Sequence, residues 1–286
     1  MTGGQAGRVA VVTDSTCYLP ADQVSALGIE VVPLQVVIDG TPCDEADPAT
    51  AERFADALRR RRPVTTSRPG PAAFASAYRR AVDGGATAVV SVHLSAQMSG
   101  TVESARLAGK ECEVPVEVVD SASLGMGLGY AVVSAAETAA DGGDVTDVTD
   151  AAVRRAQASS AIFYLDTLEH LRRGGRIGAA AALVGSALAM KPLLHLVDGH
   201  IVPLEKVRTS ARAIGRLEDL AVERAERAGA VDLAVHHLAS PERAEALAGR
   251  LRDRVPGADA LLVGEVGAVV GAHVGPGMLA VVVAPR

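Results

Sequence analysis

The sequence predicts an α/β protein of two domains, with a parallel sheet in the first half and a mixed sheet in the second. Three observations support this class. Through the first half, short apolar runs rich in valine alternate with helical segments, which is typical of strands joined by helical crossovers. From about residue 160 the strand signals become shorter and include a turn pair, Asp198-Gly199. The length of 286 residues agrees with two domains of about 150 residues each.

The first half contains strand signals that are continuous apolar runs, as expected for strands buried on both faces. We expect strands over residues 8–13, 29–38, 88–93 and 116–119. We expect helices over residues 20–27, 50–62 and 71–84, from residue 101, from the glycine turn at 125–129 through residue 140, and once more after residue 150. Pro20 suits a first helical turn. Because the strands alternate with helices, the crossovers should be right-handed and the sheet parallel.

The sequence of the second half predicts a mixed sheet with helices on one side. Its strand signals are residues 162–165, 195–197, 201–203, 233–237, 260–265 and 279–283. Asp198-Gly199 stands between two apolar runs, which predicts a hairpin. We therefore divide the chain into an N-terminal domain, 1–158, and a C-terminal domain, 159–286.

The composition excludes several classes of partner. Net charge is −6 and aromatic residues make up only 2%, so the chain offers phosphates little positive charge and bases few rings. We expect no nucleic acid partner. Cys17, Cys43 and Cys112 are widely spaced, which predicts neither a zinc site nor a disulfide and fits a reducing cytosol. Residues 1–7 lack an apolar signal core, and the apolar stretch 178–190 is short for a membrane span, so we expect a cytoplasmic protein.

Hydroxyl side chains gather where predicted strands end. Asp14-Ser15-Thr16, Ser95 and Asp120-Ser121 each follow a strand, and Thr65-Thr66-Ser67 lies in a predicted loop before Pro69. Ligands bind outside the carboxyl ends of strands in open parallel sheets, and hydroxyls beside helix N-termini suit an anion. Each of these residues alone is more often a helix cap, so both explanations stay open.

Two other features fit an anion site, and each has an ordinary alternative. Residues 171–176 place three arginines beside two glycines, which suits a carboxylate or phosphate and equally a solvated helix end. His273 lies among turn residues, where it is either inert or an anion donor. Residues 125–129 depart from the dinucleotide-binding spacing, so their glycines favour close backbone approach. The neighbours His236 and His237 point to opposite faces of a strand, and we expect no metal and no cofactor.

An ordered set of short motifs runs through nearly the whole chain, and the set is far more specific than any member. Its members are residues 12–16, 31–34 with 39–40, 66–69, 94–101, 119–121 with 125–129, 165–169, 174–177, 191–192 and 273–277. In this order they resemble the DegV family of bacterial fatty-acid-binding proteins, of the FakB type. The chain departs from the family pattern at Cys43, Arg68, Gly70 and Ala96, which affects individual contacts.

The resemblance implies an α/β/α domain with a parallel sheet, followed by a two-layer α/β domain with a mixed sheet. It implies a long-chain fatty acid in an internal tunnel and a partner fatty acid kinase that converts the bound acid to an acyl phosphate for lipid synthesis. The chain would be a carrier rather than an enzyme, with at most transient membrane contact. The alternatives are a self-sufficient phosphotransferase or hydrolase acting on a small anion, and a regulatory module that senses one. The absence of G-x-S-x-G and phosphate-loop motifs argues against the enzyme.

The resemblance also assigns roles to residues by their motif positions. The fatty-acid carboxylate would be bound by Thr66, Ser95 and His273. Positive charge facing the headgroup and the incoming phosphoryl group would come from Arg176, with Arg172 or Arg208. Candidates for the tunnel wall are Leu124, Met126 and Leu128, for which ordinary core packing is an equally good explanation.

Overall fold

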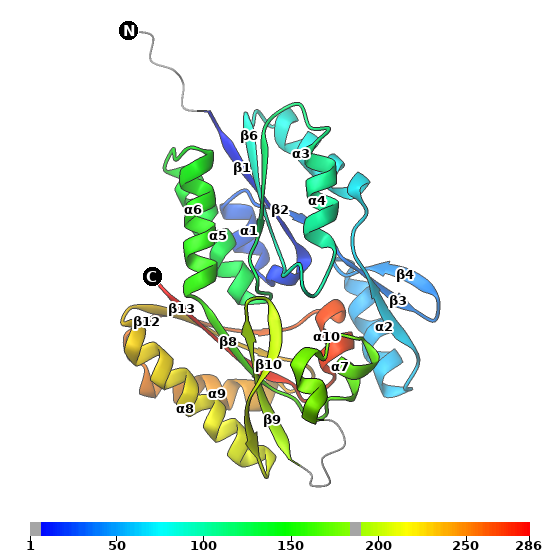
Figure 1. Ribbon diagram of the computed structural model, residues 1–286, viewed down its shortest axis with the longest axis vertical. Coiled ribbons are helices and arrows are strands. Elements are labelled where there is room, and N and C mark those ends of the chain that lie inside the picture. The colour runs from blue at the N-terminus through cyan, green and yellow to red at the C-terminus, as the bar shows by residue number, and fades with distance from the viewer. Residues whose placement is uncertain (1–6, 184–189) are drawn as a thin grey trace. The chain divides into compact units, whose positions relative to one another are not determined.

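The computed structural model describes residues 7–183 and 190–286 (Figure 1). Residues 1–6, and residues 184–189 of the apolar stretch 178–190, lie outside the described part, together with the expectations made for them. Within this part the chain forms two compact units, and each is treated separately below. No described helix is both long and apolar enough to span a lipid bilayer.

The elements of the first half run from β1 to α6. They are β1 (Val9–Asp14), η1 (Ser15–Cys17), α1 (Ala21–Ala26), β2 (Glu30–Val32), β3 (Gln35–Ile38), β4 (Thr41–Asp44), α2 (Pro48–Arg59), β5 (Val64–Ser67), α3 (Pro71–Asp83), β6 (Ala88–His93), α4 (Thr101–Gly109), β7 (Val116–Asp120), α5 (Met126–Ala140) and α6 (Val145–Ala158).

The elements of the second half run from β8 to β13. They are β8 (Ser160–Tyr164), α7 (Glu169–Arg173), η2 (Gly178–Leu183), β9 (Lys191–Val197), β10 (His200–Val207), α8 (Ser210–Ala228), β11 (Val231–His237), α9 (Pro241–Arg254), β12 (Ala258–Glu265), α10 (Ala268–Val274) and β13 (Leu279–Pro285).

The first unit is built on a parallel sheet in the order β2-β1-β6-β7. Helix α5 packs on one face, and α3 and α4 pack on the other (Figure 1). Strand β6 is buried along its whole length, which explains its nearly continuous apolar sequence. Pro71 opens α3, whose Phe74, Ala77 and Tyr78 face the core. The predicted α/β/α arrangement with a parallel sheet is confirmed.

The second unit contains a mixed sheet in the order β10-β9-β8-β13-β11-β12. Strands β11 and β12 are parallel, and the other neighbours are antiparallel. Helices α8 and α9 cover one face, as predicted (Figure 1). The predicted hairpin is present: His200 pairs with Val197, and both turn residues, Asp198 and Gly199, have positive φ, as a tight hairpin turn requires.

The single strand predicted over residues 29–38 is wrong. Pro33 interrupts it, because proline cannot donate to a strand ladder. Strand β2 before it pairs with β1 of the parallel sheet, whereas β3 after it joins a separate small sheet in the order β4-β3-β5. The loop predicted around Thr65-Thr66-Ser67 is also wrong, because these residues lie in strand β5.

Residues 36–43 and 47–66 belong to the second unit, although the predicted N-terminal domain, 1–158, contains them. Their anchor is α2, whose Phe54 is 4% exposed. A Cβ at Gly271 of α10 would lie 2.8 Å from the Phe54 ring, so the two helices are in close contact at this glycine. The predicted division at residues 158 and 159 therefore separates α2 from the helix on which it packs.

One buried histidine makes the second unit sensitive to acid. Burial lowers the pKa of His236 to about 4 from its usual 6.5. Between these values the unfolded chain binds the proton and the folded chain does not, so stability present above pH 6.5 is lost as the pH falls towards 4.

We expect a loss of about 2 to 3 kcal/mol in the free energy of unfolding between pH 7 and pH 4.5 from this group. Urea unfolding should show a smaller loss for His236→Asn, whose amide can still donate to Gly264 O as His236 Nδ1 does at 3.3 Å. Equal losses in both proteins would contradict the assignment.

Candidate functional site

Two of the predicted site residues meet in the second unit. Thr66 on β5 and His273 on α10 are 207 positions apart in sequence, and Thr66 Oγ1 lies 2.9 Å from His273 Nε2. Strand β5 brings Thr66 back from α2, and α10 packs against α2 through Gly271 and Phe54. The contact that holds α2 in this unit therefore also brings the threonine to the histidine.

The other ring nitrogen of His273 faces the turn after α7. A Cβ at Gly174 would lie 2.0 Å from His273 Nδ1, so the ring fills the space that a side chain at 174 would need. Nδ1 is buried and has no hydrogen-bond partner among the described residues. Burial, followed by the positive charge of Arg176, lowers the pKa of His273 to about 4. The imidazole is therefore neutral near pH 7.

The arginines predicted beside the headgroup have different surroundings. Arg172 and Arg173 both bind Glu169 at 2.8 Å, and their hydrogen bonds lower the pKa of Glu169 to about 2. The helix-end explanation thus accounts for Arg172. Arg176 lies beside His273 and donates from Nη1 to Gly174 O at 2.7 Å. Arg208 is exposed directly after β10.

Ser95 lies in the first unit and is fully buried. Its hydroxyl accepts a hydrogen bond from Gln97 N at 3.1 Å, and its backbone N–H donates to Ser123 O at 2.8 Å. Both bonds shape the loop that follows β6. Ser15 and Ser121, at other strand ends, likewise accept backbone N–H groups from Leu34 and Ser123.

The candidate wall residues surround the start of α5. Met126 and Leu128 are 1% and 0% exposed, and Leu124 is half-buried. A Cβ at Gly129 would lie 2.7 Å from Cys17 O, so this helix approaches backbone as closely as its glycines predict.

Sequence reasoning missed a buried polar network in the first unit. Asp14 accepts hydrogen bonds from Thr16 N and Oγ1 on one oxygen and from Leu94 N on the other. The second oxygen also lies 3.0 Å from His93 Nδ1, and His93 Nε2 lies 2.6 Å from Ser91 Oγ. Tyr78 completes the chain, its hydroxyl donating to Ser91 Oγ at 2.9 Å.

The order Asp14, His93, Ser91 is that of a hydrolytic triad, yet it cannot act as one. Ser91 and His93 are each 0% exposed, so a substrate has no access to the serine oxygen. The network instead ties the loops after β1 and β6 together. Its signal was present in the sequence: Ser91 and His93 interrupt an apolar strand two positions apart, so they share one face.

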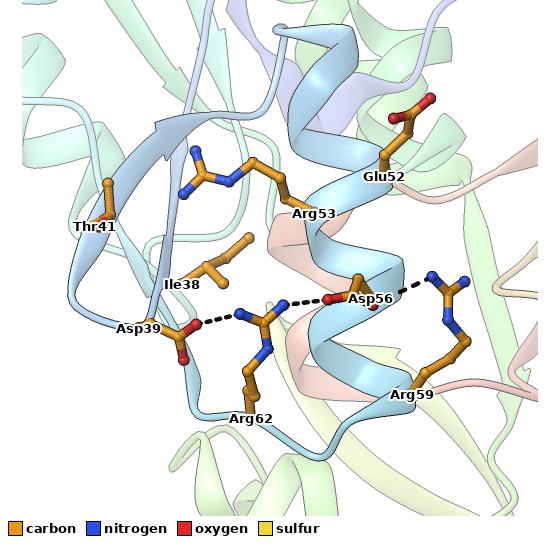
Figure 2. A pocket seen from close by; sticks show the side chains of 8 residues that line it. All are labelled: Ile38, Asp39, Thr41, Glu52, Arg53, Asp56, Arg59 and Arg62. Carbon is orange, nitrogen blue, oxygen red and sulfur yellow. Dashed lines mark hydrogen bonds and ion pairs between the residues drawn. The ribbon is translucent and has the colours of Figure 1, made fainter.

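A charged pocket of about 460 Å³ lies between α2 and the β3–β4 turn. Figure 2 shows Arg62 reaching Asp39 of the turn and Asp56 of α2, both at 2.5 Å. Its lining contains as many carboxylates as guanidinium groups, so it holds no excess charge for an anion. The pocket therefore fits a structural role, in which Arg62 fastens the turn to the helix.

A second pocket, of about 570 Å³, lies on the opposite side of α2 and is mainly apolar. Its walls include Leu58 of α2, Leu238 and Val266. The predicted site residues do not belong to the lining of either pocket. Among the described residues, no group of histidine, cysteine or acidic side chains is placed to hold a metal ion.

The chain resembles known proteins over nearly its whole length. The model of the DegV family matches residues 8–286. A DegV domain-containing protein of Streptomyces coelicolor is 57% identical over 279 residues, which cover 98% of this chain and 99% of the relative.

Solved structures agree with this match. A fatty-acid-binding DegV family protein from Thermus thermophilus superposes with a TM-score of 0.92 at 32% identity, covering 98% of this chain and 100% of the other. DegV from Bacillus subtilis, a fatty acid binding protein, superposes with a TM-score of 0.88 at 31% identity and the same coverage.

Proposed function

We propose that this chain, which belongs to the DegV family, binds a long-chain fatty acid and holds its carboxylate beside the hydrogen-bonded pair of Thr66 and His273. The observation that carries the proposal is the 2.9 Å contact between these two residues, which the family motifs assign to one site. The similar structures from Thermus thermophilus and Bacillus subtilis are those of fatty-acid-binding proteins, and this supports the same ligand class here.

The chemistry of the pair suits a carboxylate. A buried carboxylate is costly unless it is hydrogen-bonded and close to positive charge. Thr66 offers a hydroxyl, and Arg176 supplies a guanidinium near His273. The acyl chain would contribute about 0.8 kcal/mol for each buried CH₂, so affinity should rise with chain length. Ser95 is a further proposed donor, and Leu124, Met126 and Leu128 are proposed wall residues.

We further propose that the chain is a FakB-type carrier that acts in the cytoplasm. A partner fatty acid kinase would phosphorylate the bound acid, with Arg176 stabilising the transferred phosphoryl oxygens. Arg176 suits this role better than Arg172, which is bound to Glu169. The free cysteines Cys17, Cys43 and Cys112 suit a reducing compartment.

The test compares wild type, Thr66→Val and a matched control, Thr138→Val, by calorimetric titration with palmitate. We expect Thr66→Val to weaken binding about tenfold, because one hydrogen bond to a charged group contributes roughly 1.5 kcal/mol or more. Thr138→Val should bind as wild type does, since Thr138 Oγ1 donates to Ser134 O within α5.

Three outcomes would contradict the proposal. The first is a purified protein that carries no lipid and ignores added palmitate. The second is thermal protection by butyrate equal to that by palmitate, which indicates a small-anion sensor. The third is acyl phosphate formation from ATP by the chain alone, which indicates a self-sufficient enzyme.

A further inference from the structure

We infer that His273 is held as the neutral tautomer with its proton on Nε2, so that it donates to Thr66 and leaves the Thr66 hydroxyl proton for an anionic ligand. His273 is then a positioning residue for Thr66 rather than a direct contact of the carboxylate, and Gly174 is the residue that enforces the tautomer. The role assigned to the hydroxyl rests on the proposed function, whereas the tautomer does not.

The first step concerns Nδ1. It is buried against Gly174 without a hydrogen-bond partner among the residues that the structure describes. A proton placed there would be a buried N–H without an acceptor, and such a group loses its hydrogen bond to water with nothing in return. Buried N–H groups without acceptors are rarer in proteins than acceptors without donors. The proton of the neutral ring therefore belongs on Nε2.

The second step counts protons between the two side chains. The Thr66 hydroxyl has one proton and can donate it only once. If Nε2 were bare, Thr66 would donate to the histidine and present only lone pairs to a carboxylate, which repel it. With the proton on Nε2, Thr66 Oγ1 accepts across the 2.9 Å contact and its own proton remains available. Only this second arrangement can bind an anion.

The third step concerns the close packing of two turns. His273 fills the space over Gly174, and in return the ring of His170 fills the space over Gly275, where a Cβ would lie 2.3 Å from its Cδ2. Arg176 closes the first turn by donating to Gly174 O. Together these contacts leave no room for an acceptor or a side chain beside Nδ1.

Gly174 offers a clean test of this packing. Its φ of −74° and ψ of −8° suit any residue, so alanine adds no backbone strain; its Cβ would lie 2.0 Å from His273 Nδ1 and, less tightly, 3.3 Å from His170 O. Gly249 in α9 is the matched control, because apart from the backbone of its own helix no described atom lies within 4 Å of the position its Cβ would take.

The first experiment is long-range ¹H–¹⁵N NMR of the full chain without fatty acid at pH 7, with the His273 signal assigned from His273→Gln. We expect a protonated Nε2 and an unprotonated Nδ1. A proton on Nδ1, or a doubly protonated ring, would overturn the inference. Because no ligand is present, this result is independent of whether the chain binds fatty acid.

The second experiment measures palmitate affinity in a double-mutant cycle. Gly174→Ala should weaken binding about tenfold, the equivalent of roughly 1.4 kcal/mol, whereas Gly249→Ala should not. In a His273→Ala background, Gly174→Ala should have no further effect, because the ring it displaces is gone. An equal loss in both backgrounds would show that Gly174 acts independently of His273 and would overturn its assigned role.

Discussion

Replacing Asp14 by alanine is expected to lower the free energy of unfolding by about 3–5 kcal/mol, as is typical when one partner of a buried charged network is removed. The carboxylate is 0% exposed and accepts from Thr16 N, Thr16 Oγ1 and Leu94 N. Without it, these donors and His93 lose their acceptor at a position that bulk solvent does not reach. This is a large part of the 5–15 kcal/mol that usually stabilises a domain.

The matched control is Asp144→Ala in the same unit. The Asp144 carboxylate also accepts from two backbone N–H groups, those of Thr146 and Asp147, but it is exposed to water. Its loss should cost about 1 kcal/mol, as for other helix caps. Urea unfolding followed by circular dichroism measures the free energy of unfolding of both variants. If the two variants cost the same, burial of the network contributes nothing and our account of Asp14 fails.

Gly277→Ala is the second large effect, with an expected cost of about 3 kcal/mol or more. Gly277 has a φ of +87°, which costs alanine about 1–2 kcal/mol. Its Cβ would also lie 1.9 Å from Asp166 Oδ2. Asp166 cannot easily withdraw, because Tyr164 donates to its other oxygen and Arg243 Nη1 lies 3.8 Å from Oδ2. Such overpacking usually costs a further 1–3 kcal/mol.

Gly229→Ala separates the two contributions. Gly229 also has a positive φ, +85°, with a ψ of −115°, and no described atom lies near its Cβ position, so this variant shows backbone strain without a clash. We expect the lower melting temperature for Gly277→Ala, because only this variant adds the clash with Asp166 to the backbone strain. The difference between the two melting temperatures should shrink when Gly277→Ala is combined with Asp166→Ala. Equal melting temperatures for Gly277→Ala and Gly229→Ala would contradict the clash.

Local patterns predicted those elements that local chemistry determines. The apolar runs of β1 and β6 and the Asp198-Gly199 turn carry their own signals, and the structure confirms them. Pro33 also carries a signal, because proline ends a strand ladder, and it accounts for the break in the strand predicted over residues 29–38. Strand β5 carries no such local signal. It forms because it pairs with β3 in a small sheet. Its residues, Val64–Ser67, resemble a loop when read alone.

The candidate site also combines features that the sequence predicts with features that only tertiary contacts determine. The motifs selected Thr66 and His273, but the tertiary structure decides that they touch. Gly174 was recognised only as part of an arginine-glycine segment, since its contact with His273 joins α7 to α10. His93 is not among the predicted site residues, although its spacing from Ser91 places both on one face of β6. Packing contacts between distant segments therefore account for most of what the sequence did not predict.

The packing of α2 on α10 also has a consequence for the order of biosynthesis. A ribosome releases Phe54 about 200 residues before it makes Gly271, the glycine on which that ring rests. At about 5–20 residues per second, the delay is roughly 10–40 s. Throughout this interval the apolar side of α2 has no native surface to cover it, so the nascent chain should expose a chaperone-binding segment well before its second half is complete.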